Sequence, residues 1–513
     1  MIAKIIMLIV FFGIMIAVGF YSRKHATNVN DFVLGGRSVG PWLTAFAYGT
    51  SYFSAVVFVG YAGQFGYKYG LSATWIGIGN ALIGSLLAWV ILGRRTRIMS
   101  KAVKAKTMPD FFGKRYDSNA LKLAASVISF VFLIPYTASV YNGLSRLFGM
   151  AFDIPYEVCV LAMAALTCVY VILGGYMATA INDFIQGIIM LFGIVAVIVA
   201  VLSGQGGFTE AIMKLSEIPS DVPGTMGQQG AFASFFGPDP MNLLGVVILT
   251  SLGTWGLPQM VHKFYAIKDE KAVKTGTIIS TLFAIIISGG CYFLGGFGRL
   301  FDSEAIRNAE GSVVYDAIVP VMLSKLPDIL IGIVIVLVLS ASMSTLSSLV
   351  LTSSSTLTLD FIKGTIVKKM DDKKQLLCMR IFLVVFVVIS VVMALDPPTF
   401  IAQLMGISWG ALAGAFLAPF LYGLYWKGVT RAAVWASFAV GVGITVSNMF
   451  IKFIASPINA GALAMVAGLI VVPVVSLISP KMKKETVEKI FSCYEEKVVV
   501  EQKLVLTKEE EEN

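Results

Sequence analysis

A stripe of hydroxyl groups lies inside one of the most apolar stretches of this sequence. The run 339–348 reads LSASMSTLSS, and on a helix four of its residues would share one face at positions i, i+3, i+4 and i+7: Ala341, Ser344, Thr345 and Ser348. Sodium is a hard cation that takes about five or six oxygen ligands, and neutral hydroxyls can replace its water without preventing release. The alternative is that each hydroxyl bonds to the carbonyl four residues earlier.

Two apolar spans carry residues that interrupt helices. One contains the segment 49–54, GTSYFS, and the other contains the segment 251–258, SLGTWGLP. Five spans separate their starting points, which is the pattern expected of two inverted five-helix repeats, at about 42–203 and 241–426, that each open with a broken helix. Carbonyls freed at mid-membrane need a partner, and an ion or a solute would suffice. The alternative is that Gly and Ser merely allow close helix packing.

Asp183 stands at the predicted start of another span, within the sequence INDFIQ. A carboxylate at the edge of the hydrocarbon is costly unless it faces water, a partner or an ion. Two interpretations follow: Asp183 is a boundary residue that reaches the inner surface, or it reaches Ser347 and Ser348 and binds a second cation.

The elements that position these residues must cross a membrane. The chain of 513 residues has 57% hydrophobic and 13% charged residues and a mean hydropathy of +0.83, whereas soluble domains carry about 25% charge. We expect an all-α integral membrane protein with about thirteen transmembrane helices in a single domain, 1–480, followed by a charged cytoplasmic tail, 481–513. No phosphate-binding GxxxxGK[ST], HExxH or GxSxG motif occurs, which argues against an ATP-driven pump or an enzyme.

Basic residues recur in every second connection between spans. Two such groups are Arg94, Arg95, Arg97 and Lys101, and Lys263, Lys268, Lys271 and Lys274. The positive-inside rule then predicts a multi-pass protein of the cell membrane with its amino terminus outside and its carboxyl terminus in the cytoplasm. The net charge of +9 is accordingly a topology signal and does not indicate nucleic-acid binding.

Several motifs resemble, in order, those of the sodium/solute symporter family. They span most of the chain: 31–41 (DFVLGGRSVGP), 107–112 (TMPDFF), 174–176 (GGY) with 182–186 (NDFIQ), and 343–347 (MSTLS). The resemblance implies sodium symport on a thirteen-helix, leucine-transporter-like fold.

The resemblance also implies positions for the ions. The family's common sodium site would be formed by the carbonyls of Thr50, Phe53 and Ala341 and the hydroxyls of Ser344 and Thr345. Some members have a second sodium site, whose pattern is matched here by Asp183, Ser344, Ser347 and Ser348, so a stoichiometry of two sodium ions stays open. Sodium is the only bound ion or cofactor expected.

The solute is less closely defined. The segments 67–71 (YKYGL), 256–258 (GLP), 268–269 (KD) and 423–426 (GLYW) resemble those of sodium/pantothenate symporters, whereas sodium/proline symporters carry an aspartate where this chain has Tyr52. Groups facing a central cavity should come from the broken spans: Tyr52, Ser54, Gln64, Thr254, Trp255 and Gln259. For each aromatic residue, ordinary helix packing is the alternative.

We expect import of a small carboxylate, such as pantothenate or a monocarboxylate, by alternating access. The alternatives are a symporter for proline or another amino acid, a proton-coupled carrier, and a membrane sensor that binds solute without transport. The expected partners are the solute, sodium and the lipid bilayer, with no obligate protein partner.

Overall fold

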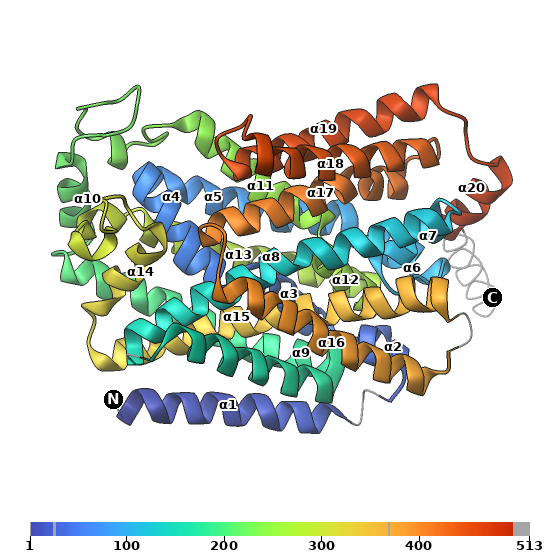
Figure 1. Cartoon of the computed structure of the whole chain (residues 1–513), viewed down its shortest axis with the longest axis horizontal. Helices are drawn as coiled ribbons and strands as arrows, with labels where there is room; N and C mark the ends of the chain where they lie inside the picture. Colours follow the sequence, from blue (N-terminus) through green and yellow to red (C-terminus); the bar gives the residue numbers. More distant parts are fainter. Residues whose placement is uncertain (1, 24–26, 153, 368–369, 496–513) are drawn as a thin grey trace, which may run out of the picture.

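The protein is an elongated bundle of helices (Figure 1). The structure is a computed structural model that describes residues 2–23, 27–152, 154–367 and 370–495. Within these ranges the only β-structure is two isolated bridges, Val39 with Ile267 and Arg307 with Val313. The all-helical class expected from the composition is confirmed.

The α-helices of the first half of the chain are α1 (Ile2–Ser22), α2 (Val29–Leu34), α3 (Pro41–Tyr52), α4 (Ala62–Tyr69), α5 (Thr74–Gly79), α6 (Arg94–Ala102), α7 (Met108–Arg115), α8 (Asn119–Phe152), α9 (Tyr156–Gly204) and α10 (Phe208–Glu217). Those of the second half are α11 (Pro240–Gly256), α12 (Pro258–Ala266), α13 (Glu270–Gly295), α14 (Tyr315–Ser324), α15 (Asp328–Thr356), α16 (Asp372–Leu395), α17 (Ile401–Tyr425), α18 (Arg431–Ile451), α19 (Pro457–Ile478) and α20 (Lys484–Phe491). Four π-helical stretches continue them, at Val56–Tyr61, Asn80–Leu87, Trp89–Gly93 and Leu357–Ile366.

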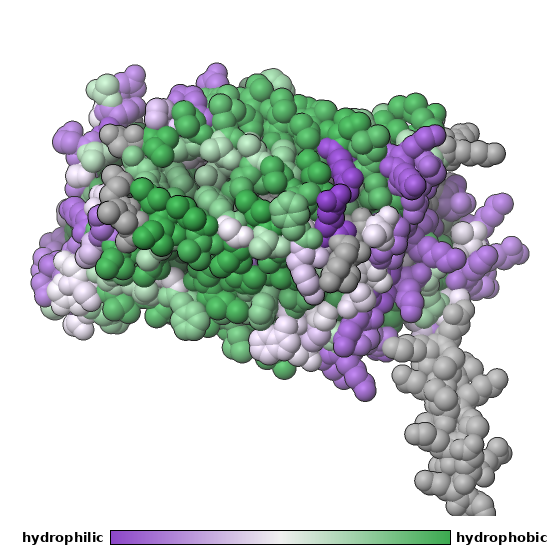
Figure 2. Space-filling model, turned by 90° about the horizontal axis from the view of Figure 1, so that it is seen from below, coloured by the Kyte–Doolittle hydropathy of each residue, from purple (hydrophilic) through white to green (hydrophobic). Residues whose placement is uncertain are grey.

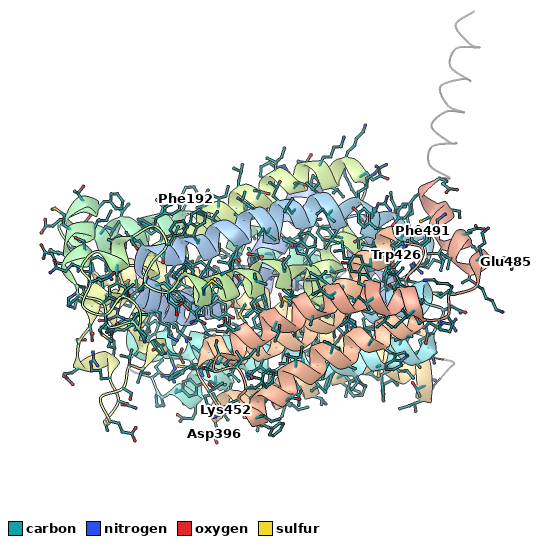
Figure 3. All side chains as sticks on the ribbon, turned by 90° about the horizontal axis from the view of Figure 1, so that it is seen from above. Phe192, Asp396, Trp426, Lys452, Glu485 and Phe491 are labelled. Atoms are coloured by element: carbon teal, nitrogen blue, oxygen red, sulfur yellow. The ribbon has the colours of Figure 1, made fainter. Side chains whose placement is uncertain are left out.

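Ten helices in the described part of the chain are long and apolar enough to cross a membrane, or eleven if the bent pair of α11 and α12 counts as one span. The apolar window of α17 is 89% buried in the bundle, whereas that of α1 is only 22% buried. Apolar side chains therefore cover much of the outer surface of the bundle, as Figure 2 shows. Phe192 on α9, labelled in Figure 3, is one of them and is 76% exposed. A surface of this kind is stable in contact with lipid, whereas exposing it to water would be unfavourable.

Polar residues gather at the ends of the bundle (Figure 2). Helices α6, α7 and α20 lie at one end, and α4, α10 and α14 lie at the other (Figure 1). The labelled residues Trp426, Glu485 and Phe491 mark the first of these ends in Figure 3. The basic helix α6, with Arg94, Arg95, Arg97 and Lys101, thus lies on the side of the carboxyl-terminal helix.

Both expected helix interruptions are confirmed. Helix α3 ends at Tyr52, and Phe53 has an extended backbone with φ −104° and ψ 111° before the chain resumes helical structure. Helices α11 and α12 meet at Leu257, which is also extended, with a bend of 45°. Pro258 follows it directly and, having no N–H group, starts a new helix without losing a hydrogen bond.

Helix α15 is the centre of the bundle. Every residue from Leu337 to Thr356 is buried, and the helix packs against α3, α8, α9 and α12. The hydroxyl stripe is therefore enclosed by protein, and the broken helix α3 lies beside it.

Two expectations about charged residues are wrong. Asp183 does not stand at the start of a span, which rules out the first of its two interpretations, because α9 continues past it in both directions and its side chain is completely buried. Lys263 is not in a loop, because it lies on α12 and is only 2% exposed. The tail assigned to 481–513 forms α20 and a short 3₁₀ turn as far as Tyr494, and positions 496–513 lie outside the described residues.

Candidate functional site

Four oxygen atoms meet where the broken helix α3 contacts α15. The Ser344 hydroxyl lies 2.8 Å from the Thr50 carbonyl and 3.1 Å from the Ala341 carbonyl. The Thr345 hydroxyl lies 3.2 Å and 3.1 Å from the same two carbonyls. We call these two carbonyls and two hydroxyls the oxygen cluster.

The break in α3 explains why the Thr50 carbonyl is available. Thr50 stands in the last turn of α3, where carbonyls lack the amide donors that a continuing helix would supply. The Thr50 hydroxyl donates to the Phe46 carbonyl of its own helix at 2.8 Å, and the residue has no exposed surface. Phe53 lies directly after this turn with an extended backbone, so its carbonyl does not follow the helical hydrogen-bond pattern of α3. It is three positions after Thr50, a member of the oxygen cluster.

The hydroxyl stripe makes contacts of both kinds that its two interpretations predict. Bonding within α15 accounts for the contacts to Ala341, but each hydroxyl also reaches Thr50 on a different helix. Each hydroxyl has one proton to donate, and the two carbonyls and two hydroxyls together carry more lone pairs than these two protons can engage. The cluster thus has surplus lone pairs and no charged member, which is the donor set that sodium favours.

A second polar group lies one helical turn further along α15. The Ser348 hydroxyl is 2.7 Å from the Ser51 hydroxyl and accepts a hydrogen bond from the Lys263 ammonium at 3.0 Å. The ammonium is 3.6 Å from an Asp183 carboxylate oxygen and 5.2 Å from the centre of the Tyr176 ring. We call Lys263, Asp183, Ser348 and Ser51 the ammonium cluster. Ser347, expected to join Asp183, donates instead to the Ser344 carbonyl at 2.8 Å.

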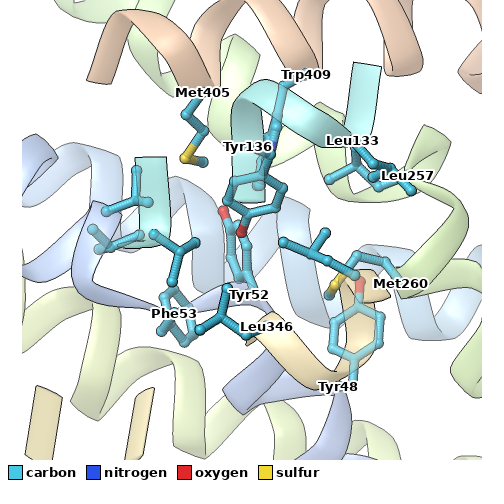
Figure 4. Packing of buried hydrophobic residues seen from close by; sticks show 14 of the residues in the cluster. Tyr48, Tyr52, Phe53, Leu133, Tyr136, Leu257, Met260, Leu346, Met405 and Trp409 are labelled. Atoms are coloured by element: carbon cyan, nitrogen blue, oxygen red, sulfur yellow. The ribbon is translucent and has the colours of Figure 1, made fainter. Parts of the chain in front are cut away.

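Aromatic residues line the region beside the break (Figure 4). The Tyr52 ring stacks on Trp409 of α17 with ring centres 5.5 Å apart and planes at 24°, and Tyr136 of α8 meets Trp409 edge-on at 5.8 Å. The Tyr52 hydroxyl donates to the Thr250 carbonyl on α11. Tyr52 therefore joins both broken helices.

The other residues expected at a central cavity divide into two groups. Thr254 donates to the Gly84 carbonyl at 3.0 Å and Trp255 to the Ile83 carbonyl at 2.9 Å, so their polar atoms join α11 to its neighbour 80–87. The Ser54 hydroxyl accepts a hydrogen bond from the Val56 amide at 3.1 Å, where the chain resumes helical structure. Gln259 is different, because its buried amide oxygen and nitrogen have no hydrogen-bond partner among the described residues.

Gln64 lies away from these residues, in a hollow at the end of the bundle opposite α20. The hollow has a volume of about 560 Å³ and is also lined by Lys68, Gln403, Asp221 and Arg299. Hydrogen bonds from the Arg299 guanidinium lower the pKa of Asp221, which is in the loop after α10. The lining of the hollow therefore carries both signs of charge.

Sequence reasoning did not identify Lys263, Tyr136 or Trp409. Lys263 was grouped with the loop lysines 268, 271 and 274, although it lies only five residues after the helix-breaking Pro258. The sequence has an acidic residue, Asp183, in one span and a basic residue, Lys263, beside the break in another. Because buried charges are normally paired, these two residues could have been predicted to meet. Tyr136 and Trp409 stand in ordinary apolar runs, which give no signal.

Comparisons with known proteins agree with this architecture. The sodium:solute symporter family matches residues 32–441. Sodium/proline symporters of Staphylococcus aureus strains are 32% identical over 497 residues, covering 94% of this chain and 93% of theirs.

Two solved structures share the fold. A Na⁺-coupled sialic acid symporter in a substrate-bound outward-open state superposes with a TM-score of 0.76 at 16% identity, covering 94% of this chain and 99% of the other. A nucleobase-cation-symport-1 family transporter gives 0.52 at 14% identity, covering 90% and 97%. These relatives and neighbours are transporters and not enzymes. With a family match over most of its length, this multi-pass membrane protein belongs to the sodium:solute symporter family.

Proposed function

We propose that this protein imports a small organic solute together with sodium, and that sodium binds at the oxygen cluster with the Phe53 carbonyl as a further ligand. The single observation that carries the proposal is the convergence of two hydroxyls of α15 on the Thr50 carbonyl of a broken helix. Residues expected from the sequence to bind one ion thus lie within hydrogen-bond distance of one another, although Thr50 is 294 positions from Ser344 and 295 from Thr345.

The mechanism we propose is alternating access. Sodium between α3 and α15 would favour one state of the bundle, because its ligands come from two helices that must stay together to bind it. Each sodium ion that enters a negative interior across 100 mV releases about 2.3 kcal/mol of electrical work, and a solute anion that enters with it takes up the same amount for each negative charge. Tyr52 is adjacent in sequence to Phe53 and stacks on Trp409, so the ion and the solute region would be coupled through the same break.

We further propose thirteen transmembrane helices in two inverted repeats, 42–203 and 241–426. The stretch 56–102 contains Gly70 with φ 64°, and α9 contains Gly175 with φ 55°. Dividing the helical stretches at these two glycines raises the eleven spans to thirteen, with the broken helices α3 and α11 at the start of each repeat. The clustering of basic residues near α20 supports a cytoplasmic carboxyl terminus, an external amino terminus and a place in the cell membrane.

For the solute, we propose a small carboxylate such as pantothenate or a monocarboxylate. The site offers aromatic surface from Tyr52, Tyr136 and Trp409 for an apolar body, and the unpaired amide of Gln259 for a polar group. Tyr52 offers a neutral hydroxyl where sodium/proline symporters have an aspartate, which disfavours a solute with a free ammonium group.

The second candidate is proline or another amino acid. It is favoured by the 32% identity to sodium/proline symporters over 94% of this chain. A zwitterion would need a partner for its ammonium group, and backbone carbonyls at the breaks could supply one.

The experiment is uptake into proteoliposomes of labelled pantothenate, lactate, acetate, proline, sialate and galactose, with and without an inward sodium gradient. We expect sodium-dependent accumulation of one carboxylate. Accumulation of proline would select the second candidate, and accumulation driven by a pH gradient with choline in place of sodium would identify a proton-coupled carrier. Binding of a solute without flux under either gradient would identify a sensor.

A further inference from the structure

We infer that the Lys263 ammonium takes the place of a second transported cation, so that this protein binds one sodium ion per transport cycle. The inference rests on the proposed sodium coupling and adds its stoichiometry. Its starting point is that a fixed positive charge lies in contact with Asp183 and Ser348, two of the four residues that match a second sodium site.

The position of the ammonium is defined by three helices. Lys263 lies on α12, Asp183 on α9 and Ser348 on α15, and the side chains of Lys263 and Asp183 are 3% and 0% exposed. The ammonium donates to the Ser348 hydroxyl at 3.0 Å, and the Tyr176 ring lies 5.2 Å away with its electron-rich face available to a cation. A mobile cation at this place would have the same neighbours.

The charge balance leaves little attraction for another cation. In the described part of the chain, Lys263 is the only cationic side chain within 4 Å of Asp183, and neither carboxylate oxygen accepts a hydrogen bond. Asp183 is therefore neutralised by Lys263 alone. A sodium ion added beside it would lie next to a buried ammonium, and their repulsion would be weakly screened because both side chains of the pair are enclosed by protein.

The three serines expected to complete the second site are already engaged. Ser344 belongs to the oxygen cluster, Ser347 donates to the Ser344 carbonyl, and Ser348 binds both Lys263 and Ser51. Of the two clusters, the oxygen cluster is the one whose members are all uncharged. Ser51 is adjacent to Thr50 at the end of α3, and its hydroxyl contacts Ser348. The Lys263 ammonium, through Ser348, thus helps to hold the end of α3 beside α15, as a sodium ion at Thr50 would.

The consequence concerns energy coupling. A lysine ammonium is covalently bound to the protein and is not transported. It therefore neutralises Asp183 as a second sodium ion would, but it adds no energy from the sodium gradient to the uptake of the solute. The maximum accumulation of the solute would then scale with the first power of the sodium concentration gradient and not with its square.

The test is equilibrium binding of radioactive sodium to the purified full-length protein, with choline keeping the ionic strength constant. We expect one sodium per wild-type chain and a Hill coefficient of about 1 for the accompanying change in tryptophan fluorescence. The variant Lys263→Met removes the charge, keeps an unbranched side chain and leaves the Asp183 carboxylate available to pair with a sodium ion, so it should bind two. The double variant Lys263→Met/Asp183→Asn removes both charges and should return to one.

Several results would overturn the inference. Two sodium ions on the wild-type chain would do so whatever the variants show, and so would one on a folded Lys263→Met chain. If Lys263→Met does not fold, Lys263→Gln, which can still donate to Ser348, replaces it with the same expectation. No bound sodium on the wild-type chain would instead overturn the proposed function itself.

Discussion

Two polar clusters lie one turn apart on α15, and they differ in charge. The oxygen cluster consists of neutral carbonyls and hydroxyls from α3 and α15. The ammonium cluster contains a buried ion pair contributed by α9 and α12. Neutral oxygen atoms with surplus lone pairs favour a cation that comes and goes, whereas an ion pair that the chain supplies itself is permanent. Under the proposed function, serines on one face of α15 contribute to the site of a transported ion in the first cluster and to a permanent ion pair in the second.

The largest effect should come from breaking the ammonium cluster. In choline and without sodium, Lys263→Met leaves the buried Asp183 carboxylate without a counter-charge, and we expect a loss of about 3–5 kcal/mol in the free energy of unfolding. Thermal unfolding in detergent measures it. The matched control, Lys263→Met/Asp183→Asn, should recover most of the loss, and equal stability of both variants would show that the two side chains are not paired.

Removing one hydroxyl from the oxygen cluster should weaken sodium binding with little effect on folding. We expect Ser344→Ala to raise the sodium concentration for half-maximal uptake about tenfold, which corresponds to about 1.4 kcal/mol. Ser355→Ala is the matched control, because Ser355 is buried on the same helix and donates to the Leu351 carbonyl of its own helix at 2.7 Å. Equal shifts in both variants would refute a special role for the oxygen cluster.

Ser348→Ala should give a smaller effect that distinguishes the two clusters. It removes the hydrogen-bond acceptor of Lys263 but no member of the oxygen cluster, so we expect a loss of about 1–2 kcal/mol in stability and an unchanged sodium stoichiometry of one. Unfolding and sodium binding on the same preparation measure both. A fall in the number of bound sodium ions would place Ser348 at an ion site and contradict its assignment to the ammonium cluster.

The smallest effect should be on the solute. Tyr52→Phe keeps the ring stacked on Trp409 but removes the hydrogen bond to the Thr250 carbonyl, so we expect the KM for solute to rise about threefold to tenfold with sodium dependence unchanged. Uptake at saturating sodium measures the change in KM. An unchanged KM would assign Tyr52 to helix packing alone.

Much of this arrangement could be predicted from the sequence because the signals were local. The i, i+3, i+4 spacing placed Ser344 and Thr345 on one face with Ala341, and the structure puts these three together with Thr50. The residue pattern around Ser54 and Pro258 predicted both breaks. Long helices with apolar windows are visible in composition alone.

The parts that sequence reasoning missed depend on distant contacts. Lys263 and Asp183 are 80 positions apart, and only the fold brings them within 3.6 Å. The residue pattern that marks α11 as broken does not say which way Thr254 and Trp255 face, and both bind backbone carbonyls of the neighbouring stretch 80–87. The number of spans also depends on the fold, because Gly175 has a non-helical backbone inside the continuous helical run of α9.

The most direct test of the central claim is a sodium titration of solute uptake by the wild-type protein, Thr345→Ser and Thr345→Val. Thr345→Ser keeps the hydroxyl at the oxygen cluster, and Thr345→Val keeps the shape of threonine without it. We predict a half-maximal sodium concentration near the wild-type value for Thr345→Ser and one at least about tenfold higher for Thr345→Val, at equal amounts of folded protein. Superimposable curves for all three would contradict sodium binding at this cluster.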